Sequence, residues 1–272
     1  MTTVTAGGSS APPAAKGNRW GRRLAALSPV LPFLALLVVW YVVWVVFQPR
    51  PAVLPEPRHV LRTATALATE GTLLRNVLES MQRLVLGSIV GILTGVAAGV
   101  LAGLNRRVAA FFNPLVVFFS ALSGIVWLPL ALVWLGIGTA MVTFIIWNSV
   151  FFLVFSNTLL GVQLVPVVLE NGVRALGAGR WRTIWQVTVP GAMPHIIAGI
   201  RAGFGFGWRA LIAAELIGAT SGLGQMIYSA ATFHRSDIII TGAITIGVIG
   251  VVMDRWLLAG LERRTIERWG MV

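Results

Sequence analysis

Cysteine is absent from the sequence, and histidine and acidic residues are scarce, numbering three and nine among 272 residues. A chain without cysteine can form neither a disulfide nor a thiolate metal site. His195 has no second histidine at metal-binding spacing, and we therefore expect no metal site. The phosphate-binding pattern Gly-x-x-x-x-Gly-Lys-Ser/Thr does not occur either, so we expect this chain to bind no ATP, Mg²⁺ or other cofactor itself.

Charge is also low. Charged residues make up 11% of the chain and hydrophobic residues 57%, whereas soluble domains are usually about 25% charged. This predicts an all-α integral membrane protein, because backbone groups in lipid must pair within helices of roughly 20 apolar residues. The net charge of +12 does not indicate nucleic-acid binding, because the basic residues, nearly all arginine, fall mainly between the apolar runs.

The apolar runs predict six transmembrane helices. Residues 1–18 are rich in Thr, Ser, Gly, Pro and Ala and predict a disordered cytoplasmic tail, which leaves 19–272 as the membrane domain. The uncharged stretch 108–169 is about twice the length of one span, and we expect it to turn at Gly136-Ile137-Gly138. The expected spans lie at about 27–47, 84–104, 110–135, 139–162, 190–218 and 238–258.

The segment at 50–82 begins with several prolines and continues with a polar helical pattern. We expect an external loop with a surface helix here, and the second span after Arg83. Small residues recur every four positions along that span, at Gly87, Gly91, Gly95 and Gly99. This spacing puts them on one helical face and predicts close packing against another helix.

An even number of spans places both termini on one side of the membrane, and the basic residues indicate which side. Thirteen of them lie on the side of the termini and six on the other. The six are Arg50, Arg58, Arg62, Arg75, Arg83 and Arg235. Because cytoplasmic loops carry the excess of Lys and Arg, we expect a multi-pass protein of the inner, or plasma, membrane with both termini in the cytoplasm.

The loop at 165–189 is long, patterned and on the expected cytoplasmic side. Gly177 and Gly179 divide it into two short helices. Its apolar residues approximate one helical face and are Val173, Leu176, Trp181, Ile184 and Trp185. Such a helix either lies on lipid or docks in a groove of another protein, and periodicity alone does not choose between them.

At this loop the sequence resembles the membrane-spanning permease subunits of bacterial ATP-binding-cassette importers, whose cytoplasmic loop carries the EAA motif. Gly177 matches the central glycine of the motif. Ten residues on, Val187 takes the usual isoleucine place, and Val189-Pro190 takes the place of Leu-Pro. The front of the motif departs from the family, with Asn171-Gly172-Val173 in the Glu-Ala-Ala positions.

The resemblance extends over roughly residues 75 to 268. Gly207-Trp208, Ala213–Ile217 and Ala219–Gly224 look like the nitrate, sulfonate and taurine branch of these permeases. That branch implies a small anion as the solute.

The resemblance implies a type I importer-like permease with no enzymatic activity of its own. It would pair with a second copy or a paralogous permease, two cytoplasmic ATPases that bind ATP and Mg²⁺, and an external substrate-binding protein. Its loop helix would dock in a cleft of the ATPase as a coupling helix. The expected coupling residues are Asn171, Gly172, Val173, Arg174, Leu176, Gly177, Arg180, Trp181, Val187, Val189 and Pro190.

Arg209 and Glu215 are rare charges inside an expected span, and with the neighbouring Trp208 they are candidate residues of the translocation pathway. They are six positions apart, so a pair between them would need another helix or a break in this one. The alternative is that Glu215 lies near the external interface, solvated or in a structural pair.

Other function classes fit less well. A membrane-embedded enzyme needs paired acids, a metal set or Ser with a base, and we find none of these constellations in the sequence. A channel is disfavoured by the patterned loop at 165–189 and by the lack of a filter-like repeat. An importer of another small organic solute remains open.

Overall fold

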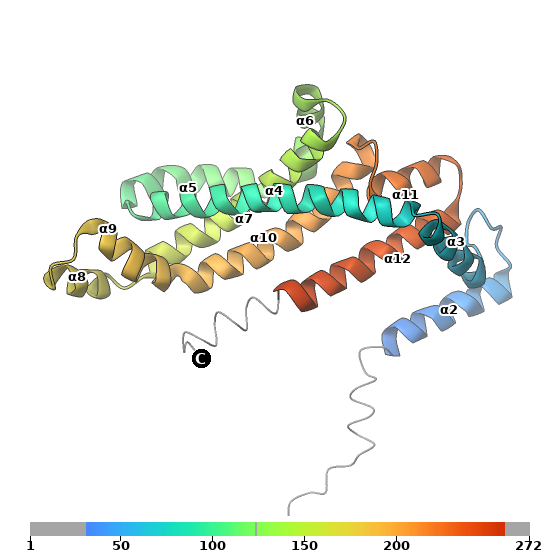
Figure 1. Cartoon of the computed structure of the whole chain (residues 1–272), viewed down its shortest axis with the longest axis horizontal. Coiled ribbons are helices and arrows are strands. Elements are labelled where there is room, and N and C mark those ends of the chain that lie inside the picture. Colours follow the sequence, from blue (N-terminus) through green and yellow to red (C-terminus); the bar gives the residue numbers. More distant parts are fainter. Residues whose placement is uncertain (1–30, 123, 259–272) are drawn as a thin grey trace, which may run out of the picture. The chain divides into compact units, whose positions relative to one another are not determined.

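The structure is a computed structural model that describes residues 31–122 and 124–258, and its elements are helical throughout that part of the chain (Figure 1). The chain divides into two units, Met1–Arg50 and Pro51–Val272. The first contains α2 (Leu31–Phe47), a 17-residue apolar helix in which Tyr41 stacks on Trp44. The expected tail at 1–18 lies outside the described residues.

The second unit holds the remaining helices, which include short 3-10 (η1) and π-helical (η2, η3) segments. They are α3 (Pro57–Thr69), α4 (Thr72–Gly103), α5 (Arg106–Ala121), η1 (Gly124–Trp127), α6 (Leu128–Leu135), α7 (Thr139–Leu164), α8 (Val167–Ala175), α9 (Arg180–Thr183), η2 (Ile184–Thr188), α10 (Val189–Gly218), α11 (Leu223–Thr232), α12 (Ser236–Val252) and η3 (Met253–Leu258).

The glycine face of α4 packs closely on α7, as its four-residue spacing predicts. A Cβ placed on any of these glycines would lie 2.7–3.0 Å from an atom of α7. The side chains that the glycines meet also recur every four residues. They are Ile146 at Gly87, Val150 at Gly91, Val154 at Gly95 and Thr158 at Gly99. Two helices whose small and branched residues share one period can interlock along their whole contact.

A second helix, α10, uses glycines in the same way. A Cβ on Gly207 would lie 2.9 Å from Val150, and one on Gly203 would lie 3.1 Å from Val154. Both valines are fully buried, because α4 and α10 contact them together. The core of the second unit is therefore α7 with its two glycine-faced neighbours.

The expected number of six spans is not confirmed. Four segments of the described chain are long and apolar enough to cross a membrane: Thr72–Gly103, Thr139–Leu164, Arg180–Gly218 and Ser236–Arg255. The third expected span, 110–135, is broken, because the axis of α5 and that of the following η1–α6 segment differ in direction by 87°. If α5 and this segment together form one bent span, the described chain has five spans. Pro129 lies in the first turn of α6, where a missing N–H costs nothing. The segment after Leu122 is thus suited to starting a new helix.

The expectation for residues 50–82 is corrected at α4. This helix begins at Thr72, not after Arg83, and continues unbroken for 32 residues, about 48 Å at 1.5 Å per residue. The surface helix is α3 alone, and Gly71 with φ 76° separates the two. Arg75 donates to Glu79 at 3.0 Å, one helical turn on, which stabilises the polar start of α4.

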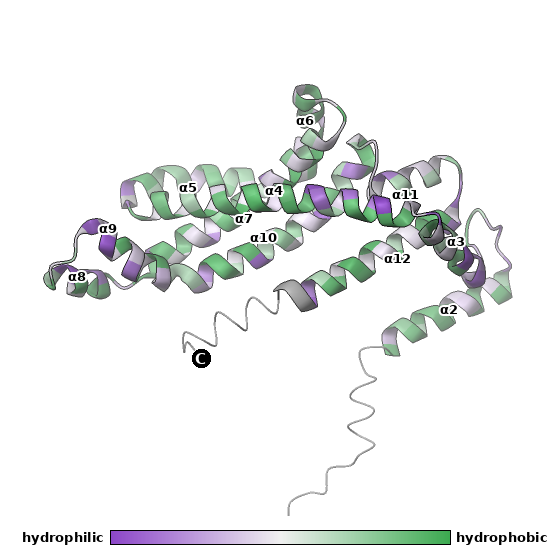
Figure 2. Ribbon diagram, viewed as in Figure 1, coloured by the Kyte–Doolittle hydropathy of each residue, from purple (hydrophilic) through white to green (hydrophobic). Residues whose placement is uncertain are grey.

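Hydrophilic residues are concentrated at the two ends of the second unit. Figure 2 shows them on α3 and the first turns of α4, and again on α8 and α9. In between, the middle of α12 is mostly apolar, while α7 carries polar residues such as Asn148 and Asn157 within an apolar sequence. This distribution matches helices that span a hydrocarbon layer and end in polar surroundings on both sides.

Candidate functional site

Glu215 lies near the end of α10 with its side chain fully buried. Its Oε1 accepts a hydrogen bond from Nη1 of Arg83 at 2.8 Å. The hydroxyl of Ser80 lies 2.8 Å and 2.9 Å from its two carboxylate oxygens. The backbone N–H of Gly224 donates to Oε2 at 3.0 Å. The carboxylate therefore has a cationic partner and two further donors, the condition under which a buried charge is tolerated.

The same network holds the turn between α10 and α11 against α4. Arg83 donates from Nη1 to the carbonyl oxygen of Ser221 at 2.7 Å and from Nη2 to its hydroxyl at 2.8 Å. Gly222 has φ 109° and its N–H donates to Oδ1 of Asn76 at 2.9 Å. A Cβ on Gly224 would lie 2.6 Å from that of Glu215. The turn thus closes around the carboxylate.

Glu215 and Arg209, both expected in the pathway, are not brought together. Arg209 is exposed on α10, and its guanidinium carbon lies 5.5 Å from the centroid of the Phe206 ring. It makes no ion pair with any residue in the described ranges. Trp208 is half-buried and faces α12, where a Cβ on Gly250 would lie 3.2 Å from its Nε1. The pathway role of all three stays a prediction.

Sequence reasoning missed Arg83, Ser80 and Asn76, yet a signal for them is present. Counting back from Gly87 by four, three and four residues reaches these three positions, so they continue the glycine face of α4. The face of α4 that packs on α7 through glycines in the middle of the helix is polar near its start, where it holds the turn between α10 and α11.

The loop at 165–189 consists of α8, a turn at Gly177, and the short α9 and η2 segments. Gly177 has φ 87°, and the turn closes with two hydrogen bonds, from its N–H to Arg174 O and from Ala178 N to Val173 O. This is the Schellman ending of a helix, which favours glycine because a Cβ is disfavoured at positive φ.

Large apolar side chains of this loop face outward. Leu176 is 89% exposed, Trp181 72% and Trp185 67%. The other expected coupling residues are exposed as well, apart from four half-buried ones, Val173, Val187, Val189 and Pro190. Large apolar side chains that are exposed on one loop indicate a surface that binds a protein or lipid.

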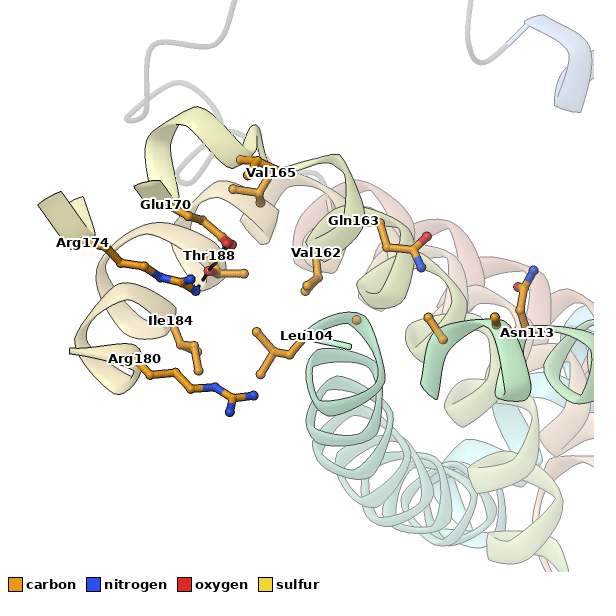
Figure 3. Close-up of a pocket in the computed structure, with 14 residues that line it drawn as sticks. Leu104, Asn113, Val162, Gln163, Val165, Glu170, Arg174, Arg180, Ile184 and Thr188 are labelled. Atoms are coloured by element: carbon orange, nitrogen blue, oxygen red, sulfur yellow. Dashed lines mark hydrogen bonds and ion pairs between the residues drawn. The ribbon is translucent and has the colours of Figure 1, made fainter. Parts of the chain in front are cut away.

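Hydrogen bonds and ion pairs hold the loop together internally. The hydroxyl of Thr188 donates to Oε1 of Glu170 at 2.9 Å, and Arg174 lies 3.8 Å from Oε2 of the same carboxylate. The loop packs on the helix bundle through Val165 and Val187, which join an apolar cluster with Val162 of α7 and Ala192 of α10. Between the loop and the α4–α5 turn lies a cavity of about 920 Å³ (Figure 3). Arg180 extends towards Leu104 across this space (Figure 3).

Comparison with known proteins identifies a matching protein family and several similar proteins. Residues 91–266 match the family described as binding-protein-dependent transport system inner membrane component. The taurine transport system permease protein TauC of Escherichia coli K12 is 33% identical over 242 residues, covering 87% of this chain and 88% of TauC. The bicarbonate transport system permease protein CmpB of Synechococcus elongatus is 29% identical over 260 residues, covering 90% of this chain and 92% of CmpB.

Among solved structures, an inward-facing conformation of the MetNI methionine ABC transporter is similar in fold. The TM-score is 0.57 at 18% sequence identity, and the match covers 71% of this chain and 97% of the other. The matched family range begins within the glycine face of α4 and includes the whole loop at 165–189 and α10.

Proposed function

The chain belongs to the family of binding-protein-dependent transport system inner membrane components, and we propose that, with a second permease chain, it forms the pathway by which a small anion crosses the inner membrane. It is the permease subunit of an ATP-binding-cassette importer, a multi-pass membrane protein of the taurine, sulfonate and nitrate branch. It works with an ATPase, which hydrolyses ATP, and with a substrate-binding protein.

The observation that carries the proposal is the outward-facing apolar surface of the loop at 165–189. Leu176, Trp181 and Trp185 are between 67% and 89% exposed on a loop that the Thr188–Glu170 hydrogen bond braces internally. The loop packs on the bundle through Val165 and Val187. A rigidly held apolar surface can take up force from a partner that binds it, whereas a loose one would only bend. We place the coupling to the ATPase here, with both termini on this cytoplasmic side.

The proposed solute is a small molecule with a negatively charged oxygen-containing group, either a free anion or, as in taurine, a sulfonate within a zwitterion. TauC is named for taurine, which carries a sulfonate, and CmpB for bicarbonate. Arg209, exposed on an apolar helix with no acidic partner among the described residues, supports an anionic solute, because an intramembrane cation needs a counter-charge or water. ATP and Mg²⁺ are assigned to the partner ATPase, and no cofactor to this chain.

The proposed assembly has two permease chains and two ATPases. A solute pathway lined by Arg209 would lie between two copies of this chain, since Arg209 faces outward from the single chain. A homodimer is the simplest arrangement, and pairing with a paralogous permease is its alternative.

The test is reconstitution of the permease, its ATPase and its binding protein in lipid vesicles. Radiolabelled taurine, nitrate and bicarbonate are offered separately, and methionine serves as the comparison solute. We expect ATP-dependent uptake of at least one of the anions, and none when the ATPase or the binding protein is left out. Uptake without ATP would indicate a channel, and uptake of methionine alone would overturn the anion assignment.

A further inference from the structure

We propose that the pocket beside the break between α5 and η1, with the side-chain amide of Asn148 as its hydrogen-bonding group, is where the permease contacts the anion during transport. This inference rests on the proposed function and gives it a location. The pocket has a volume of about 230 Å³ and lies between the end of α5, η1, α7 and α10.

The lining of this pocket combines aromatic rings with uncharged polar groups. Ser120, Asn148 and Ser149 supply hydroxyl and amide groups, and Phe119, Phe152 and Phe206 supply the rings. The volume is below the range of about 300–1,000 Å³ usual for larger ligands. The pocket therefore suits a small solute.

Asn148 is the buried polar side chain of this pocket that lacks a partner among the described residues. It is the tenth residue of α7 and only 5% exposed, yet its side chain makes no hydrogen bond with any residue of the described ranges. Its neighbour Ser149 donates to the carbonyl oxygen of Ile145 at 3.0 Å, and Asn157 on the same helix donates to that of Leu153 at 2.8 Å. An unpaired amide in apolar surroundings is costly. The amide of Asn148 is therefore available to a partner that enters the pocket, either water or a solute.

The backbone beside Asn148 also favours the binding of water or a solute in this pocket. α5 ends at Ala121, Leu122 is extended, and a new helix begins at Gly124. Non-helical backbone within a membrane is tolerated where it is buried in protein or lines a water-filled cavity. A Cβ on Gly124 would collide with the hydroxyl of Ser149, so glycine is needed for η1 to approach α7. The end of α5, Leu122 and the start of η1 thus all line the pocket.

Arg209 connects the pocket to the proposed pathway. Phe206 lines the pocket, and the guanidinium of Arg209 lies 5.5 Å from the centroid of this same ring. A cation near the pocket attracts an anion, while the neutral amide and hydroxyl groups solvate it without holding it as a salt bridge would. Weak, uncharged donors suit a transporter, because binding must be strong enough for entry and weak enough for release.

The experiment compares Asn148→Ala and Asn148→Asp with Asn157→Ala in the reconstituted importer. Asn157 lies on the same helix, but its amide is satisfied by its own helix, which makes it the matched control. The readout is the number of radiolabelled taurine molecules delivered per ATP hydrolysed, with nitrate and bicarbonate as further probes. We expect this ratio to fall about tenfold in Asn148→Ala, because the variant loses one hydrogen bond to a charged group and such a bond corresponds to about that factor. In Asn148→Asp we expect an equal or larger fall, and in Asn157→Ala no change.

Thermal stability distinguishes this role from a structural one. Asn148→Ala removes an unpaired amide, so we expect it to unfold at the wild-type temperature or above, with ATPase stimulation by the loaded binding protein retained. A wild-type transport ratio in both Asn148 variants would overturn the inference while leaving the proposed function intact. If the wild-type importer takes up none of the three anions, the proposed function fails and the inference fails with it.

Discussion

Nη1 of Arg83 lies 2.8 Å from Oε1 of Glu215, although 132 residues separate them in sequence. Their ion pair joins the first half of α4 to the end of α10. It is buried, with side-chain exposures of 5% and 0%. A pair of this kind is costly to break from one side, because the remaining charge is left without a counter-charge.

We expect Arg83→Met and Glu215→Gln each to destabilise the protein by about 3–5 kcal/mol. The double variant Arg83→Met/Glu215→Gln should recover most of this loss, because it leaves no uncompensated charge. The measurement is thermal unfolding of the purified permease in detergent. Arg75→Ala is the control: Arg75 is 79% exposed, and its pair with Glu79 should contribute less than about 1 kcal/mol.

The same double variant tests whether Glu215 acts in the pathway. If the role of Glu215 is purely structural, the double variant, once its stability is recovered, should transport at close to the wild-type rate. A stable double variant that has lost uptake would instead support the pathway role. If the stability lost in the double variant equals the sum of the losses in the two single variants, the two residues do not interact, and the pairing itself is contradicted.

Arg209→Gln should lower anion uptake about tenfold, the size of one lost charge-assisted contact, while membrane insertion stays intact. Arg209→Lys keeps the charge and should retain more uptake. Uptake is measured in vesicles against Arg58→Gln as the control, since Arg58 has an 81% exposed side chain outside the apolar helices. Wild-type uptake in both Arg209→Gln and Glu215→Gln would mean that these charges are incidental to transport.

The sequence predicted the all-α membrane fold and the glycine face of α4, because long apolar runs and fixed spacing are local signals. The partner of Glu215 was beyond such reasoning, since it depends on which helices meet in space. The break after Ala121 was missed for another reason: residues on both sides of it are apolar, so hydropathy is the same for a straight and a bent span. The turn at Gly177 was found because glycine marks it directly.

Close packing through the glycine face predicts that Gly91→Ala is destabilising by about 1–3 kcal/mol, the usual cost of overpacking. A Cβ at this position would lie 2.8 Å from that of Val150. Gly205→Ala on α10 is the matched control, because nothing lies within 4 Å of its Cβ position, and helix propensity there favours alanine by up to about 1 kcal/mol. Equal stabilities of the two alanine variants would contradict the close contact.

The topology prediction can be tested by single-cysteine labelling, because the natural chain contains no cysteine. Val53→Cys, at a 72% exposed position, should react with a membrane-impermeant maleimide added outside intact spheroplasts. Leu176→Cys and a cysteine appended at the C-terminus should react only after the membrane is opened. Labelling of Val53→Cys and the C-terminal cysteine from the same side would refute the six-span topology.

Gly177 provides the sharpest test of the coupling loop, because Asp and Asn can be compared there. Both residues tolerate left-handed backbone better than most, and they are nearly equal in size. The position has φ 87° and open space around a Cβ, so the two variants should share the same modest backbone cost. They differ in charge, and an unpaired charge is expensive to bury against a partner.

We therefore expect Gly177→Asp to lose the ATPase on co-purification and to lose uptake, with the spans still inserted. Gly177→Asn should keep most of both, since an amide can find hydrogen bonds in an interface without the cost of a buried charge. Equal failure of both variants would place the requirement in the backbone angle of the turn rather than in a buried contact. Wild-type co-purification and uptake in both would mean that the ATPase docks elsewhere, because a new charge beside Leu176 would then touch no partner.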